Sequence, residues 1–148
     1  MMKIIGELLP KRRMQHIQGA QDWEEAVRIA SRPLLKDHSI EENYIDAMIA
    51  SVHQNGPYIV LKDFFALPHA QAGIGVNEVG MSLLTLDKPV DLKGNPVKVF
   101  MVLAAIDSDS HLEALSELST LLMDDDIYEI FISGDLNKIN EIINKEGK

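Results

Sequence analysis

The chain has 148 residues, of which 46% are hydrophobic and 25% charged, which is the size and composition of one globular domain. Its formal net charge of −9 repels polyanions and argues against a surface that binds nucleic acid or anionic membrane. The chain has no cysteine, which excludes disulfides, thiol catalysis and thiolate metal sites and fits a reducing compartment.

The N-terminal segment gives no sign of a signal peptide. Its basic cluster, Lys11 to Arg13, follows a short apolar stretch instead of preceding a long one. The longest apolar run, residues 99–106, has eight residues, whereas a helix that crosses a bilayer needs roughly 20. We therefore expect one cytoplasmic domain over residues 1–148, with no direct insertion into a membrane.

Two helices are predicted in the first third of the chain. The first begins after Asp22, which can cap an acidic first turn, and Pro33 is expected to kink or end it. The second begins with a capping box, Ser39 followed by Glu42, and stops at Asn55-Gly56.

The middle of the chain has the pattern of strands. A loop with two glycines is expected at residues 70–77, and a turn at residues 91–96. The strands around them are predicted at residues 58–61, 64–67, 79–86 and 97–105. The last two runs are apolar on both pleat faces, which indicates interior strands covered by helices on each side.

Three helices are predicted after the strands. Ser110 and Glu113 form a second capping box, ahead of a stripe of leucines that begins at Leu112 and a helix that runs to about Met123. The acidic residues 124–126 can cap a short helix, and Gly134-Asp135 opens the last one. Because helices bracket the strands, the predicted fold class is α/β.

Two of the five histidines lie where open α/β sheets place their sites. His69 follows an apolar run at the end of a predicted strand, and His111 lies in the first turn of the helix behind an interior strand. We expect both imidazoles to meet over one edge of the sheet. The sequence has no P-loop, dinucleotide-binding glycine motif or His-Glu-x-x-His motif, so no cofactor and no metal are predicted.

A histidine pair without metal or nucleotide can still transfer phosphoryl groups. Imidazole titrates near pH 6.5, so much of it is uncharged and nucleophilic at neutral pH. A phosphoryl group on His69 needs hydrogen-bond donors, which the ring of His111 and the backbone amides at the start of the 111–123 helix can supply. Phosphoryl transfer requires mainly positioning and charge stabilisation.

Other interpretations of these residues stay open at this point. His69 and His111 can be structural residues, or zinc ligands together with Asp107 or Asp109. The remaining histidines, His16, His38 and His53, are predicted to serve the surface or packing. Three methionines lie in core-like patterns and are predicted to pack in the core; they are Met81, Met101 and Met123. Apolar side chains at residues 64–65 and around Ile74 can surround the acceptor or belong to the core.

Four segments together resemble a known family. Gly-Pro-Tyr-Ile-Val, Ala-Leu-Pro-His-Ala, Lys-Pro-Val-Asp-Leu and Leu-Ala-Ala-Ile-Asp-Ser-Asp-Ser-His-Leu-Glu-Ala-Leu occur at residues 56–60, 66–70, 88–92 and 103–115. In this order and spacing they resemble the enzyme IIA domain of the mannitol/fructose type (type 2) from the bacterial sugar phosphotransferase system (PTS). The likeness covers nearly the whole chain.

The resemblance implies a mixed, mostly parallel sheet flanked by helices on both faces, and a cytosolic phosphocarrier. The family's acceptor histidine falls on His69, and its second active-site histidine falls on His111. The implied phosphoryl donor is phospho-HPr and the implied acceptor is an enzyme IIB, which serves the membrane enzyme IIC. Neither a cofactor nor a metal is implied, and no oligomeric state is assigned.

One position departs from the family's pattern. Mannitol-type members carry an arginine before the acceptor strand. This chain has Ser51 at the matching position and no arginine after Arg32. Residues 56–60 and the context of His111 resemble the ascorbate branch, so the expected transported compound is ascorbate or a relative of it. The alternative is a regulatory module, similar to the nitrogen-related enzyme IIA proteins, whose phosphorylation state controls partner proteins.

Overall fold

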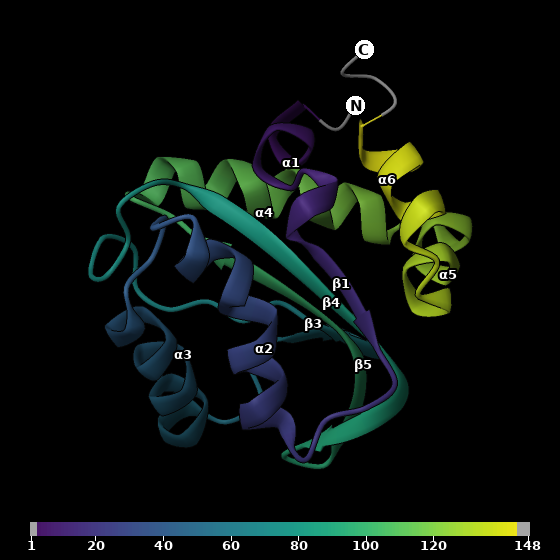
Figure 1. Ribbon diagram of the computed structural model, residues 1–148, viewed down its shortest axis with the longest axis horizontal. Coiled ribbons are helices and arrows are strands. Elements are labelled where there is room, and N and C mark those ends of the chain that lie inside the picture. Colours follow the sequence, from purple (N-terminus) through teal and green to yellow (C-terminus); the bar gives the residue numbers. More distant parts are fainter. Residues whose placement is uncertain (1–2, 145–148) are drawn as a thin grey trace.

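The computed structural model describes residues 3–144 and arranges them as one sheet between two groups of helices (Figure 1). The strands within these residues are β1 (Met14–Ile17), β2 (Val60–Lys62), β3 (Phe64–Ala66), β4 (Gly80–Leu92) and β5 (Asn95–Ala104). The helices are α1 (Lys3–Leu8), α2 (Trp23–Lys36), α3 (Glu42–Asn55), α4 (Ser108–Leu122), α5 (Asp125–Ser133) and α6 (Leu136–Asn144), with a 3-10 turn at Lys11–Arg13. The predicted α/β class is confirmed, and residues 1–2 and 145–148 of the predicted domain lie outside the described part.

The sheet is mixed, in the order β1-β4-β5-β3-β2. Strands β1 and β4 are parallel, as are β3 and β5, whereas β4 with β5 and β2 with β3 are antiparallel. Helices α2 and α3 cover one face, and α1, α4, α5 and α6 cover the other (Figure 1). Within residues 3–144, none of the helices has both the length and the hydropathy to span a bilayer.

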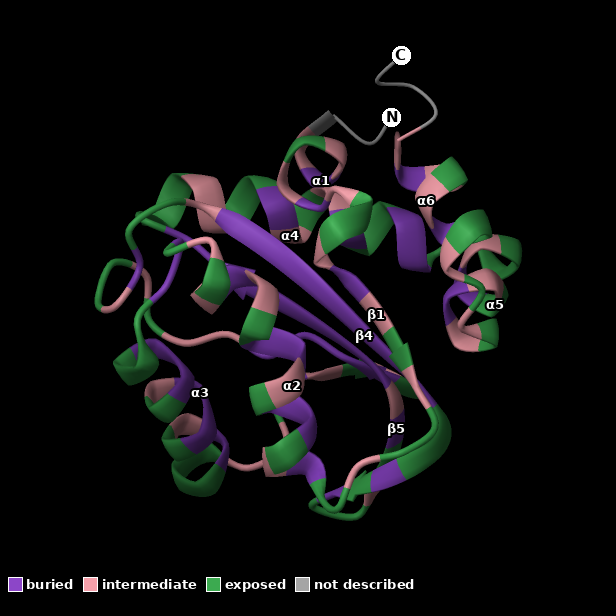
Figure 2. Ribbon diagram, viewed as in Figure 1, coloured by how far each residue is buried: buried purple, intermediate pink, exposed green. Residues whose placement is uncertain are grey.

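Residues 80–86 of β4 and 99–104 of β5 are buried on both faces of the sheet, whereas the far end of β4 is partly exposed (Figure 2). Leu84 and its register partner Phe100 pack under α2 and α3, whereas Leu83 and Met101 pack on the opposite side. This alternation produces the continuous apolar runs in the sequence. Met81 and Met101 lie in the core as predicted, but that prediction is wrong for Met123, which ends α4 and is 82% exposed.

The turn between β4 and β5 is shorter than expected. The strands pair as far as Leu92 and Asn95, leaving only Lys93 and Gly94 between them. Both residues have positive φ, 53° and 96°, as a two-residue turn of type I′ requires. The predicted six-residue turn at 91–96 is therefore wrong at both ends.

Helix α2 begins where predicted and continues through its proline. The Asp22 side chain accepts a hydrogen bond from the Glu25 amide at 2.8 Å, which caps the first turn. Pro33 has no N–H for the carbonyl four residues earlier, that of Ile29. The side-chain amide of Gln15 on β1 donates to this carbonyl at 2.8 Å, so the helix runs on to Lys36.

The two predicted capping boxes are wrong, although both helices exist. Ser39 is buried ahead of α3, where its carbonyl accepts from the Asn77 amide, and the helix starts at Glu42. For α4 the cap is Asp107, which accepts from the Ser110 amide at 2.9 Å. Serine followed three residues later by glutamate is a short pattern, and in both places tertiary contacts or a nearer aspartate fix the helix start.

The N-terminal helix α1 and strand β1 were not predicted. Strand β1 has four residues, of which only Met14 is buried, so its sequence shows no usable alternation. A side chain of α4 stabilises helix α1: the Glu117 carboxylate accepts hydrogen bonds from the backbone amides of Ile4 and Ile5 at 3.0 and 2.7 Å. The contact comes from a residue more than 100 positions away, and local sequence cannot show it.

The Gln15 contact leads to a double-mutant prediction. Gln15→Ala should lower the free energy of unfolding by about 1 kcal/mol, since it leaves the Ile29 carbonyl without its partner. In a Pro33→Ala background the backbone N–H of residue 33 can bond the Ile29 carbonyl. There, Gln15→Ala should lower the free energy of unfolding by clearly less. Urea unfolding of the four proteins measures both costs. An equal cost in both backgrounds would show that Gln15 does not compensate for the proline.

Candidate functional site

The pairing of β3 with β5 brings two distant segments to one edge of the sheet. The two strands are parallel, with Ala66 beside Phe100, so the segments that follow them leave in the same direction. The segment after β3 stays against β5, because the Leu103 amide donates to the Pro68 carbonyl at 3.0 Å. His69 comes next, while the segment after β5 leads into α4 and His111.

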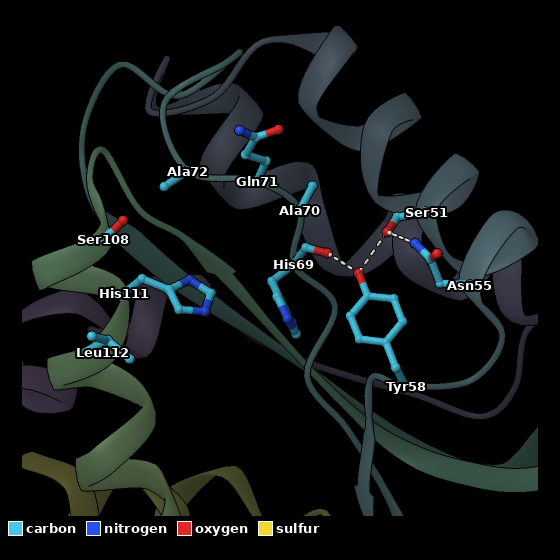
Figure 3. A pocket seen from close by; sticks show the side chains of 10 residues that line it. All are labelled: Ser51, Asn55, Tyr58, His69, Ala70, Gln71, Ala72, Ser108, His111 and Leu112. Carbon is cyan, nitrogen blue, oxygen red and sulfur yellow. Dashed lines mark hydrogen bonds between the residues drawn. The ribbon is translucent and has the colours of Figure 1, made fainter.

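The imidazole rings of His69 and His111 lie side by side. Their centroids are 5.2 Å apart and the planes are inclined by 60°. On the other side of His69, the Tyr58 ring packs edge to face at 5.2 Å and 86°. Figure 3 shows the His69 ring between these two neighbours. The structure thus brings together the two histidines that the sequence singled out.

Hydrogen bonding selects one tautomer of His69. Its Nδ1 lies 2.6 Å from the backbone carbonyl oxygen of Leu67, which can only accept. Nδ1 therefore carries the hydrogen, and the lone pair of the neutral ring is on Nε2. The arrangement leaves Nε2 as the nucleophilic atom.

Both histidines are held uncharged near neutral pH. Burial lowers the pKa of His69 below its usual 6.5, against the opposing effect of the Leu67 carbonyl, and the neighbouring His111 lowers it further. Burial also lowers the pKa of His111. Two adjacent imidazoles disfavour a second positive charge, so an unprotonated His69 is the main form at pH 7.

The histidines face an open pocket of about 590 Å³ between α3, the segment before β2, and the start of α4. Ser51, Asn55 and Gln71 line it together with the aromatic rings. Apart from the histidines, the lining side chains are neutral. Such a pocket offers hydrogen-bond donors to an anion without a fixed counter-charge.

Some of the predicted donors are placed differently. Helix α4 starts at Ser108, three residues earlier than predicted, so the amide of His111 is already bonded to the Asp107 carbonyl at 3.2 Å. The expectation that amides at residue 111 are free for a phosphoryl group is wrong. The His111 ring still faces the pocket. Leu112, the first residue of the predicted leucine stripe, also lines the pocket and is 63% exposed.

The other histidines lie outside this pocket. His16 bonds Thr85 and Asp87, His53 bonds Glu24, and His38 takes a positive φ of 64° at the end of α2. Among the residues that the structure describes, no three His, Asp or Glu side chains gather to hold a metal ion. The zinc alternative therefore has no ligand set to support it.

Several residues that line the pocket carry no functional signal in the sequence. Among them, Tyr58 lies in a predicted strand, Asn55 at a predicted helix stop and Gln71 in a predicted loop. The available signal was weak, since each residue only adjoins a helix end or a strand end. Of the apolar candidates, Phe65 is buried in the core and Ile74 is 65% exposed.

Known proteins match this chain over most of its length in sequence and in structure. The mannitol-specific cryptic phosphotransferase enzyme IIA component of Escherichia coli (strain K12) is 37% identical over 136 residues, 90% of this chain and 92% of that protein. A solution structure under that name superposes with a TM-score of 0.87 at 35% identity, covering 95% and 98% of the two chains. The ascorbate-specific PTS system EIIA component of the same strain is 30% identical over 132 residues, 86% of each chain.

A more distant structure shares the fold. It is a complex of enzyme IIAMTL and phosphorylated enzyme IIBMTL from Escherichia coli, with a TM-score of 0.75 at 20% identity over 93% of this chain and 96% of that one. Residues 7–146 match the family model described as "Phosphoenolpyruvate-dependent sugar phosphotransferase system, EIIA 2". The chain therefore belongs to the EIIA 2 family of the phosphoenolpyruvate-dependent sugar phosphotransferase system.

Proposed function

We propose that this protein accepts a phosphoryl group on Nε2 of His69 from phospho-HPr and passes it to an enzyme IIB. The observation that carries the proposal is the hydrogen bond from Nδ1 of His69 to the Leu67 carbonyl, beside the ring of His111. It presents a neutral ring with its lone pair on the opposite nitrogen. In this reaction His69 is the catalytic nucleophile of a phosphotransferase with a phosphohistidine intermediate.

The chemistry balances without metal or cofactor. The Nε2 lone pair forms the new N–P bond while the N–P bond of the donor breaks, and the donor nitrogen keeps the electron pair. The phosphorylated ring retains its hydrogen on Nδ1 and is positively charged, and the Leu67 carbonyl stabilises that charge. A positively charged ring is also a good leaving group, which favours the second transfer to enzyme IIB.

His111 is the second residue of the proposed site. Each of its ring nitrogens donates or accepts a hydrogen bond, depending on the tautomer. The centroid of its ring lies 5.2 Å from that of the His69 ring. A ring N–H directed at the transferred group stabilises the oxygens that carry its charge. We assign His111 to stabilisation of the phosphoryl group.

We infer the partners of this protein from its family membership. An enzyme IIA of this system works in the cytoplasm between HPr and an enzyme IIB, which acts with the membrane protein IIC. Relatives named for mannitol and for ascorbate match nearly the same part of the chain. We therefore propose uptake of a small polyhydroxylated compound as the process served. The regulatory alternative uses the same histidine chemistry, and no feature of the site favours it.

The acceptor assignment predicts a loss of labelling. With enzyme I, HPr and radiolabelled phosphoenolpyruvate, the protein should take up one acid-labile phosphoryl group, and His69→Gln should take up none. His53→Gln is the matched control, because His53 is an exposed imidazole on α3 outside the pocket, and it should label like the wild type. Labelling that persists in His69→Gln would remove the assignment.

The role of His111 predicts two changes in His111→Ala. Transfer to enzyme IIB should slow by about 10²-fold, the typical effect of removing one stabilising donor. The pKa of His69, measured by NMR titration, should rise towards 6.5, because the substitution removes the neighbouring imidazole and exposes the ring. Unchanged kinetics with an unchanged pKa would reduce His111 to a helix residue without a part in transfer.

A further inference from the structure

The peptide group that follows His69 is held by two tyrosine hydroxyls. Its N–H, from Ala70, donates to the Tyr44 hydroxyl at 3.1 Å, and its carbonyl, from His69, accepts from the Tyr58 hydroxyl at 2.9 Å. Both polar atoms of one peptide plane are thus bonded to side chains from other segments. The orientation of this plane determines how the His69 side chain leaves the backbone.

The two tyrosines differ in their surroundings. Tyr44 is 1% exposed and donates its own hydrogen to the Leu103 carbonyl at 2.7 Å, so it belongs to the core of α3 and β5. Burial raises the pKa of Tyr44 to about 12, which keeps its hydroxyl protonated. Tyr58 is 40% exposed and lines the pocket. Only Tyr58 can be altered without opening the core.

The hydrogen bonds around Tyr58 have a single consistent direction. The hydroxyl has one hydrogen, and the His69 carbonyl can only accept, so this hydrogen is donated there. Ser51 Oγ lies 2.9 Å from the Tyr58 hydroxyl oxygen, so Ser51 must donate its hydrogen in this bond. Asn55 Nδ2 in turn donates to Ser51 Oγ at 3.3 Å. Figure 3 shows this chain of three side chains, which ends on the backbone of His69.

We propose that Tyr58 is a positioning residue for phosphoryl transfer at His69, with Ser51 and Asn55 fixing the direction of its hydroxyl. This inference rests on the proposed function of His69 and extends it to residues that do not touch the phosphorus. Tyr58 makes two contacts with His69. Its hydroxyl bonds the peptide group that follows His69, and its ring packs against one side of the imidazole, with the ring centroids 5.2 Å apart. Together with the Leu67 carbonyl, these contacts hold Nε2 towards the incoming group.

Positioning has a measurable share in such a reaction. Phosphoryl transfer depends mainly on the alignment of donor, phosphorus and acceptor, so small rotations of the acceptor ring reduce the rate. Replacing Tyr58 by phenylalanine removes the hydroxyl and keeps the ring. We expect the maximum rate of transfer from phospho-HPr to His69 to fall by about fivefold to tenfold, with an unchanged half-saturating concentration of phospho-HPr.

The chain offers a matched control for this substitution. Tyr128 on α5 also donates its hydroxyl to a backbone carbonyl, that of Asp63, and it lies outside the pocket. Tyr128→Phe should leave the transfer rate unchanged. Ser51→Ala, which removes only the support of the Tyr58 hydroxyl, should lower the rate in the same direction as Tyr58→Phe but by a smaller factor.

The experiment combines single-turnover kinetics with NMR of the His69 ring nitrogens. In Tyr58→Phe the ¹⁵N shifts of His69 should move towards a mixture of tautomers, as its bond to Leu67 loosens, whereas in Tyr128→Phe they should not move. Wild-type rates and shifts in Tyr58→Phe would overturn the inference, and so would a raised half-saturating concentration at an unchanged rate. If the wild type accepts no phosphoryl group, the proposed function fails, and the shifts still test the positioning by Tyr58.

Discussion

The hydrogen bond between Nδ1 of His69 and the carbonyl of Leu67 is the contact on which the site depends. It joins atoms only two residues apart, yet the backbone that makes it possible is set by distant partners. The Ile59 carbonyl accepts from the Leu67 amide, and the Leu103 amide donates to the Pro68 carbonyl. The edge of the sheet therefore fixes both the tautomer and the direction of the nucleophile before any partner protein arrives.

Under the proposed function, a protein with a net charge of −9 receives a strongly anionic group in this pocket. The pocket is lined by neutral side chains with amide hydrogens, Asn55 and Gln71, and by two imidazoles kept uncharged by burial. A neutral acceptor ring is nucleophilic, whereas a protonated one is not. Partial burial thus lowers the proton affinity of His69, and it would also strengthen hydrogen bonds to the oxygens of the proposed phosphohistidine.

The sequence was sufficient where a signal is local. The Asp22 cap, the stop at Gly56, the short helix behind Asp124 and the interior strands β4 and β5 were all predictable from neighbouring residues. Local sequence was insufficient where a contact with a distant residue stabilises an element. Gln15 bonds the Ile29 carbonyl that Pro33 leaves without a partner, and Glu117 accepts from the backbone of α1. The site shows the same division. His69 and His111 were recognisable because each follows a predicted strand. The hydrogen bonds of Tyr44 and Tyr58 to the peptide group between His69 and Ala70 join separate segments, and local sequence does not show them.

The most direct test is the position of the phosphoryl group on the ring of His69. After phosphorylation by phospho-HPr, ¹⁵N and ³¹P NMR of the histidine-labelled protein distinguishes attachment at Nε2 from attachment at Nδ1. Because Nδ1 is occupied by its hydrogen bond to Leu67, we predict phosphorus at Nε2 and a retained hydrogen at Nδ1. Phosphorus at Nδ1, or on another residue, would contradict the account of how this site is built.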